Sequence, residues 1–364
     1  MKSVSRVRWI LFIGGAIVML SVPGFILLHI PGEAVDNNQY KKEELVFRSG
    51  DFKIVGDLKL PEGEGPHPVI LFVHGDGPNN RTSGVTYPPI MKRMLGVGYA
   101  TFAWDKPGTG ASTGEIDRSR LVEQRAQIVL DAIKVMKERE EIDPQMIGLW
   151  GISQAGYVMP RVLSISDDVA FMIAVSCPGE PGVEQGIYLI TAQAVCGGLP
   201  ETDRAPVESL LSAAARAQTY QEHVRFKSRL RDYPELAVLS EYGVNIDVRS
   251  EDEWHADDLD GPYFWDPIAV IEHTTIPVLA FFGEKDTQAD PIQGAQAYTE
   301  ALTRAGNPFF RVELIPGVDH NLIISETGSL LEREQRSRAG WTNYAPEYLD
   351  ILTRWLTELR TQGK

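Results

Sequence analysis

Apolar runs of strand length recur along the chain from residue 44 to residue 317. The first two, 44–49 and 52–60, are separated only by a short turn, which predicts a hairpin. The continuous apolar run 67–75 is typical of a fully buried parallel strand. Runs of the same form follow at 99–105, 145–151, 168–176, 275–283 and 308–317.

Helical patterns lie between most of these runs. They occur at about 84–97 and 117–141, directly after Ser153, and at about 291–306 and 345–361. Strands that alternate with helices predict βαβ crossovers. The expected fold class is therefore α/β, with a mostly parallel eight-stranded sheet flanked by helices.

The interval between Ser176 and Ile276 departs from this alternation, because it contains several helical runs and no strong strand. It can form an ordinary set of packed helices or a helical cap over a site, and the two are compatible. We expect a core of residues 39–181 and 271–364, with a helical cap insertion at 182–270.

The N-terminal residues 1–38 predict a membrane anchor or signal segment followed by a linker. Basic residues precede an uncharged run, 9–30, which as a helix would span about 33 Å, against about 30 Å for the hydrocarbon core. A cleaved signal is the alternative, because Pro23-Gly24 could end a shorter helix and "GEA" at 32–34 is a passable cleavage site. Either way the following chain is expected outside the cytoplasm.

The composition excludes several kinds of partner. The net charge of −15, with basic residues clustered only near the N-terminus, argues against nucleic acid and against polyanionic substrates. Cys177 and Cys196 are the only cysteines, and without a C-x-x-C pair they do not predict a structural zinc site. Two free buried thiols are favoured over a disulfide between them.

Two serines compete for the role of nucleophile. Ser112 lies in "GASTG", which matches G-x-S-x-G, whereas Ser153 lies in the poorer match "GISQA". A nucleophilic serine sits on a sharp turn between a strand and a helix, flanked by small residues that allow close packing. Ser153 has this context, with Gly151 before it and Ala155 after it. Ser112 follows Asp105 in a glycine-rich loop, so Ser153 is the predicted nucleophile.

A base and an acid follow in the expected order. His320 follows the last predicted strand, at the edge of the sheet where sites gather in such folds. Asp286 follows the penultimate strand and is the predicted acid that orients His320. Glu284 is its nearest rival, and Asp290 is expected to cap a helix before Pro291.

Two backbone N–H groups are predicted to bind the oxyanion of the tetrahedral intermediate. One belongs to Gln154, at the start of the helix after the nucleophile. The other belongs to Asp76 in "HGDGP", with Gly77 as the alternative. The same five residues could instead form only a tight turn.

The motifs together resemble those of α/β-hydrolase-fold serine hydrolases. They are "HGDGPNNR", "DKPGTGAST", "IDPQMIGLWGISQAG", "IPVLAFFGEKDTQADP" and "GVDH". The chain is most similar to bacterial carboxylesterases with an H-G-S-G-P oxyanion loop, on the prolyl-oligopeptidase-like and dienelactone-hydrolase-like branch. It departs from them at Asp76, where serine is usual, and at Ala155, where the elbow glycine is usual. The resemblance implies that Ser112 occupies a structural position.

The expected function is hydrolysis of small-molecule carboxylic esters through an acyl-enzyme, with no metal or organic cofactor. Tyr263, Phe264 and Trp265 are expected to line the acyl pocket, although they could equally be packing at the base of the cap. The alternatives are an amidase or aminoacyl-peptidase, an acyltransferase on the same triad, and a catalytically silent binding protein. The sequence leaves the oligomeric state open.

Overall fold

The computed structural model describes residues 40–84, 86–242, 244, 246–251, 254, 265–339 and 343–362. The predicted N-terminal segment 1–38 lies outside these residues and stays a prediction. In the part of the chain that is described, no helix combines the length and the apolar character that crossing a bilayer requires.

One eight-stranded sheet organises the molecule, in the order β1-β2-β4-β3-β5-β6-β7-β8. Its strands are β1 (Tyr40–Ser49), β2 (Phe52–Pro61), β3 (His67–Val73), β4 (Ala100–Trp104), β5 (Ile142–Ile152), β6 (Phe171–Val175), β7 (Val278–Gly283) and β8 (Phe310–Ile315). The pairs β1–β2 and β2–β4 are antiparallel, and all other neighbours are parallel. The predicted fold class, with its mostly parallel eight-stranded sheet, is confirmed.

The helices around the sheet are α1 (Tyr87–Gly96), α2 (Leu121–Lys137), α3 (Ala155–Leu163), α7 (Ile268–Ile271), α8 (Pro291–Arg304), α9 (Leu330–Ala339) and α10 (Pro346–Gln362). Short 3₁₀ helices are η1 (Arg118–Arg120), η2 (Arg229–Asp232) and η3 (Pro234–Tyr242). The predicted helices correspond to α1, α2, α3, α8 and α10, whereas α7 and α9 were not predicted. The carboxylate of Asp290 accepts from the N–H groups of Ile292 and Gln293 at 3.0 Å each, which confirms its predicted role as the cap of α8.

Alternate residues of the central strand β3 serve opposite faces of the sheet, as the two-residue period of a strand requires. Val69, Leu71 and Val73 belong to the apolar cluster that contains buried residues of α2, α3 and α8. Ile70 and Phe72 belong to the cluster that contains buried residues of α1 and α10. The continuous apolar run of this strand is therefore explained by helices on both faces.

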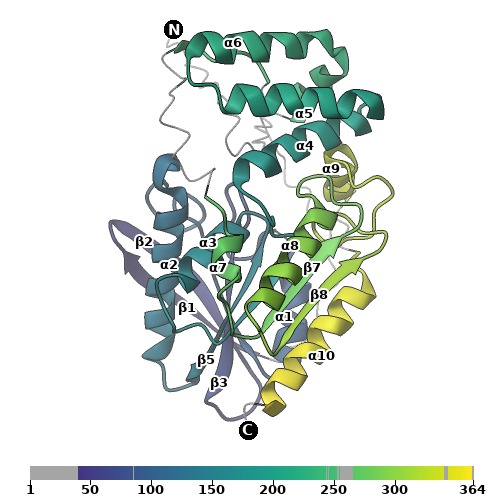
Figure 1. Ribbon diagram of the computed structural model, residues 1–364. Coiled ribbons are helices and arrows are strands. Elements are labelled where there is room, and N and C mark those ends of the chain that lie inside the picture. The colour runs from purple at the N-terminus through teal and green to yellow at the C-terminus, as the bar shows by residue number, and fades with distance from the viewer. Residues whose placement is uncertain are drawn as a thin grey trace.

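A third apolar cluster joins α4 (Gly182–Cys196), α5 (Glu201–Ala215) and α6 (Tyr220–Ser228) with η2 and η3. Figure 1 shows these three helices stacked at one end of the sheet, with α9 beside them. This arrangement agrees with the helical character predicted for the interval. The domain boundaries at 182 and 270 stay a prediction, because residues 255–264 lie outside the described part.

The two cysteines are free. Cys177 is buried as expected, but Cys196, at the end of α4, is exposed. The expectation that both thiols are buried was therefore wrong for Cys196, because the last turn of α4 faces solvent there.

Candidate active site

Ser153 occupies the turn between β5 and α3. Its φ of +57° lies in the left-handed region, which costs a residue with a side chain roughly 1–2 kcal/mol. A Cβ on Gly151 would lie 2.6 Å from the Cβ of Ala155. A Cβ on Gly156 would lie 2.7 Å from the Cβ of Cys177. Only glycine fits at these two positions, and the strand and helix therefore meet closely enough to present Ser153 on a sharp turn.

Ser112 has a different environment. Its hydroxyl is buried and accepts from the backbone N–H of Val55 in β2 at 2.9 Å. The loop before it is held by Asp105, whose carboxylate accepts from the N–H of Ala111 at 2.8 Å and from the N–H of Arg81 at 2.9 Å. The hydroxyl of Ser112 thus joins its loop to the sheet.

Asp286 and His320 are joined by a hydrogen bond. Oδ2 of Asp286, after β7, lies 2.7 Å from Nδ1 of His320, after β8, and both side chains are buried. The other carboxylate oxygen accepts from the N–H groups of Gln288 at 2.7 Å and Ala289 at 3.0 Å. These bonds fix the orientation of the carboxylate, which in turn fixes the tautomer of His320 with its proton on Nδ1.

The rival acid Glu284 has another partner. Its carboxylate accepts from the N–H of Gly317 at 2.8 Å and so holds the turn after β8. Asp290 caps α8. Of the three acids in this stretch, Asp286 is the one bonded to His320.

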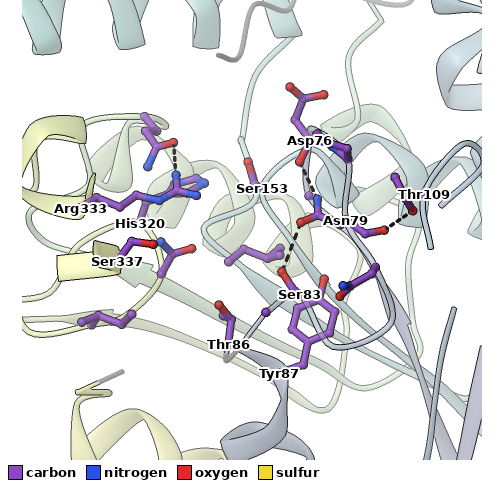
Figure 2. A pocket seen from close by; sticks show the side chains of 18 of the residues that line it. Asp76, Asn79, Ser83, Thr86, Tyr87, Thr109, Ser153, His320, Arg333 and Ser337 are labelled. Atoms are coloured by element: carbon purple, nitrogen blue, oxygen red, sulfur yellow. Dashed lines mark hydrogen bonds between the residues drawn. The ribbon is translucent and has the colours of Figure 1, made fainter. Parts of the chain in front are cut away.

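Ser153 and His320 line one pocket, of about 560 Å³. Figure 2 shows Ser153 between His320 on one side and Asp76 on the other. Gly75 belongs to the same wall, because a Cβ there would lie 3.4 Å from the Cβ of Ser153. The loop after β3 therefore passes directly beside the serine.

The carbonyl groups of residues 74–77 in this loop are bound by side chains. Arg125 of α2 donates to the carbonyl of His74, and Lys106 donates to the carbonyls of Gly75 at 3.0 Å and Gly77 at 2.7 Å. Asn79 donates to the carbonyl of Asp76 at 2.6 Å. Fixed carbonyl directions fix the peptide planes, and with them the directions of the N–H groups that were predicted to face an oxyanion.

The carboxylate of Asp76 accepts from the side-chain amide of Gln154 at 2.9 Å. In Figure 2 it points away from the space between Ser153 and His320. The amide oxygen of Gln154 in turn accepts from Arg125. Burial lowers the pKa of Arg125 to about 10 and that of Lys106 well below its usual value, while the charge of Asp76 raises both. The unusual carboxylate thus compensates two buried cations.

His74 follows β3 at the start of the loop, and its buried side chain anchors the loop to the core. Its Nε2 donates to the carbonyl of Trp104 at 2.5 Å, and its Nδ1 therefore accepts from the hydroxyl of Tyr87 at 2.8 Å. Burial lowers the pKa of His74 to about 3, so the imidazole is neutral. It is held within the core rather than presented to the pocket.

Sequence reasoning missed the side chains that hold the loop. Arg125 carried a usable signal, because it lies on the apolar face of α2 with Val122, Ala126 and Val129. A cation at such a position needs a buried acceptor.

Of the three aromatic residues predicted to line the acyl pocket, Trp265 belongs to the described part of the chain. Tyr263 and Phe264 lie outside the described residues. Trp265 is half-buried and is not among the described residues that line the pocket of Ser153 and His320.

Comparison with solved structures identifies the α/β-hydrolase fold, which confirms the predicted resemblance at the level of the fold. One neighbour is an esterase of Pyrococcus furiosus, Pf2001, with a TM-score of 0.50, 14% identity, and coverage of 88% of this chain and 93% of that chain. Another is DcsB, solved in complex with its substrate analogue, with a TM-score of 0.52, 16% identity, and coverage of 88% and 98%.

Curated relatives are similar over shorter stretches or at low identity. An uncharacterized 31.7 kDa protein of Escherichia coli is 37% identical over 101 residues, 27% of this chain, and the match spans only 33% of its length. Esterase EstD of Thermotoga maritima is 20% identical over 332 residues, which cover 89% of this chain and 69% of the esterase. No protein-family model matches the chain.

Proposed function

We propose that the protein is a serine hydrolase that cleaves carboxylic esters through an acyl-enzyme. The observation on which this rests is the 2.7 Å bond between Asp286 and His320 at the edge of a pocket that Ser153 also lines. The names of two similar proteins, the Pyrococcus esterase and esterase EstD, support the same class of reaction.

The reaction divides into two steps. In the first, Oγ of Ser153 attacks the ester carbonyl while Nε2 of His320 takes its proton. The bond from the carbonyl carbon to the alcohol oxygen breaks, and His320 returns the proton to that oxygen. In the second, water attacks the acyl-enzyme, His320 takes a proton from the water, and Ser153 leaves with it. The products are a carboxylic acid and an alcohol.

The remaining groups stabilise the charges that develop on His320 and on the substrate oxygen during the reaction. Asp286 orients His320 and stabilises its imidazolium form. The N–H groups of Asp76 and Gln154 donate to the oxyanion of each tetrahedral intermediate. In this proposal the helices of 182–270 form a cap over the pocket, while the described residues that line it come from other parts of the chain.

Labelling with a fluorophosphonate probe tests the nucleophile. Wild type and Ser112→Ala are expected to react, and Ser153→Ala is expected not to, while circular dichroism shows all three folded. Loss of labelling in Ser112→Ala alone would overturn the assignment. A folded wild type that never reacts would indicate a silent binding protein.

Rate comparisons separate the related activities. An ester panel measured beside aminoacyl-anilides distinguishes an esterase from a peptidase. Acyl transfer to an added alcohol, in competition with water, identifies an acyltransferase. Ester hydrolysis is the expected dominant reaction.

The cellular location belongs to the same proposal and rests on the uncharged run 9–30. The catalytic domain is expected outside the cytoplasm, behind an uncleaved anchor. Fractionation of cells tests this, because an anchored protein sediments with membranes, whereas a soluble protein with a shortened N-terminus indicates a cleaved signal.

A further inference from the structure

Arg333 brings a positive charge to the pocket that contains Ser153 and His320. It comes from α9, is solvent-exposed, and lines the pocket. Figure 2 shows it beside His320, on the side of Ser153 opposite to Asp76. Nothing in the proposed reaction uses this cation.

The guanidinium of Arg333 is held in place by a neutral group. It donates to the side-chain oxygen of Gln288 at 3.0 Å, and the N–H of Gln288 donates to Asp286 at 2.7 Å. These two hydrogen bonds, from Arg333 to Gln288 and from Gln288 to Asp286, connect Arg333 to the loop of the proposed catalytic acid. They hold the guanidinium on the side of the pocket where His320 lies.

The pairing of Arg333 differs from that of the next arginine on the same helix. Arg336 forms ion pairs with Asp319 and with Glu332. Among the described residues, Arg333 forms no ion pair, so its charge is compensated only at longer range. A guanidinium has five donors in a planar fork that matches a carboxylate. One bond to an amide leaves most of this capacity available to a ligand.

Arg336 lines the same side of the pocket, but its charge is paired with Asp319 and Glu332, and the other polar groups there are neutral. Asn321 and Ser337 line it next to Arg333, and they can donate to an anion. Asp76 is the only acidic residue among the described lining residues. It lies on the opposite side of the pocket from Arg333, and its carboxylate accepts from Gln154. The side of the pocket next to His320 is therefore locally basic in a protein with a net charge of −15.

The place of Arg333 determines which part of an ester it meets. The carbonyl oxygen must face the loop of Asp76 and Gln154, and the leaving oxygen must face His320, which returns the proton to it. Because Arg333 lies on the side of His320, it faces the alcohol part of the substrate.

We propose that Arg333 binds a carboxylate on the alcohol part of the substrate, so that the preferred substrates are esters of hydroxy acids. This rests on the proposed ester hydrolysis. The protein-wide negative charge disfavours polyanions, so the ligand is expected to contain a single carboxylate near the scissile bond.

A pair of substrates that differ only in this charge tests the proposal. They are meta-acetoxybenzoate and its neutral analogue meta-acetoxybenzamide. Wild type is expected to show at least about tenfold higher kcat/KM for the acid, as charge-assisted hydrogen bonds give. Arg333→Gln is expected to lose this preference, with the rate on the amide unchanged within about twofold. Arg333→Lys is expected to retain part of it.

Controls separate this effect from folding and from general charge. Arg354→Gln removes an exposed arginine from α10, outside the pocket, and is expected to keep the preference. Equal rates of wild type on the two substrates would overturn the proposal, and so would an equal loss on both in Arg333→Gln. A preference found only for phenyl hemiglutarate over its neutral amide would overturn the assignment to the alcohol part.

Binding separates failure of this inference from failure of the proposed function. Calorimetry of meta-acetoxybenzoate with Ser153→Ala, with and without Arg333→Gln, needs no turnover. Tenfold weaker binding in the double variant supports the role of Arg333 even if wild type hydrolyses no ester. Equal binding in the two variants would overturn it.

Discussion

The side-chain amide of Gln154 donates to the carboxylate of Asp76 at 2.9 Å, and so links the two residues whose N–H groups we propose as oxyanion donors. Arg125 binds the other end of the same amide. The negative charge of Asp76, at a position where serine is usual in the carboxylesterases that the chain resembles, is thus linked through Gln154 to the buried cation Arg125.

Asp76→Asn should uncouple rate from stability. The amide can still accept from Gln154, but the charge that repels an oxyanion is gone, so kcat is expected to rise by up to about tenfold. The buried cations Lys106 and Arg125 lose their compensation, so stability is expected to fall by about 1–3 kcal/mol. Steady-state kinetics and thermal melts check both effects, with the exposed Asp51→Asn as control. A hundredfold fall in kcat would instead give the carboxylate a direct role.

Asp286→Asn is expected to lower kcat by about three to four orders of magnitude, because the amide no longer holds His320 in the productive tautomer. Glu284→Gln provides the matched control, since that carboxylate bonds the N–H of Gly317. It is expected to change kcat by less than about tenfold. Ester kinetics on both variants decides between the two acids, and the reverse ranking would exchange their roles.

Ser153→Gly should be more stable than Ser153→Ala, although both are expected to be inactive. Alanine retains the cost of a side chain at a φ of +57°, whereas glycine adopts this region freely. After the greater chain entropy of unfolded glycine is subtracted, the expected difference is about 1 kcal/mol. Chemical denaturation measures it, and a more stable alanine variant would contradict the strain at the turn.

Glu180 should make stability depend on pH. Burial raises its pKa from 4.5 to about 7, and the nearby Asp290, Glu184 and Glu208 add like-charge repulsion. Between these two values the folded chain keeps a proton that the unfolded chain releases, so stability falls as pH rises through this window. Glu180→Gln removes the penalty, which is about 3 kcal/mol at most. Its advantage over wild type is expected to appear above pH 4.5 and to level off above pH 7.

Melting curves across this range check the prediction, with the exposed Glu115→Gln as the comparison. An advantage of Glu180→Gln that is constant from pH 4 to pH 8 would show that packing, and not titration, is responsible.

The sheet was predictable because its strands are fully buried and therefore continuous in apolar residues. The choice of Ser153 over Ser112 followed from the same property, since only Ser153 comes directly after such a strand. The structure gives Ser112 a hydrogen bond to β2 that no local pattern could have specified.

The position of Arg333 in the pocket could not be predicted, because α9 has no apolar stripe. Its sequence "LLEREQRSRA" is mostly charged or polar, and its first N–H, that of Leu330, is bound by Gln193 of α4. The helix is therefore fixed by tertiary contacts rather than by its own periodicity. For Trp265 the expected role stays a prediction, because aromatic character alone does not say which cavity a side chain lines.

The loop beside Ser153 takes its shape from Lys106, which follows β4, and from Arg125 in α2, in addition to the bond that Asn79 makes within the loop. It can reach its working form only after β4 and α2 have docked against β3. Recovery of activity during refolding should then lag behind formation of the sheet. Its rate should equal the rate at which the slower of β4 and α2 docks against β3.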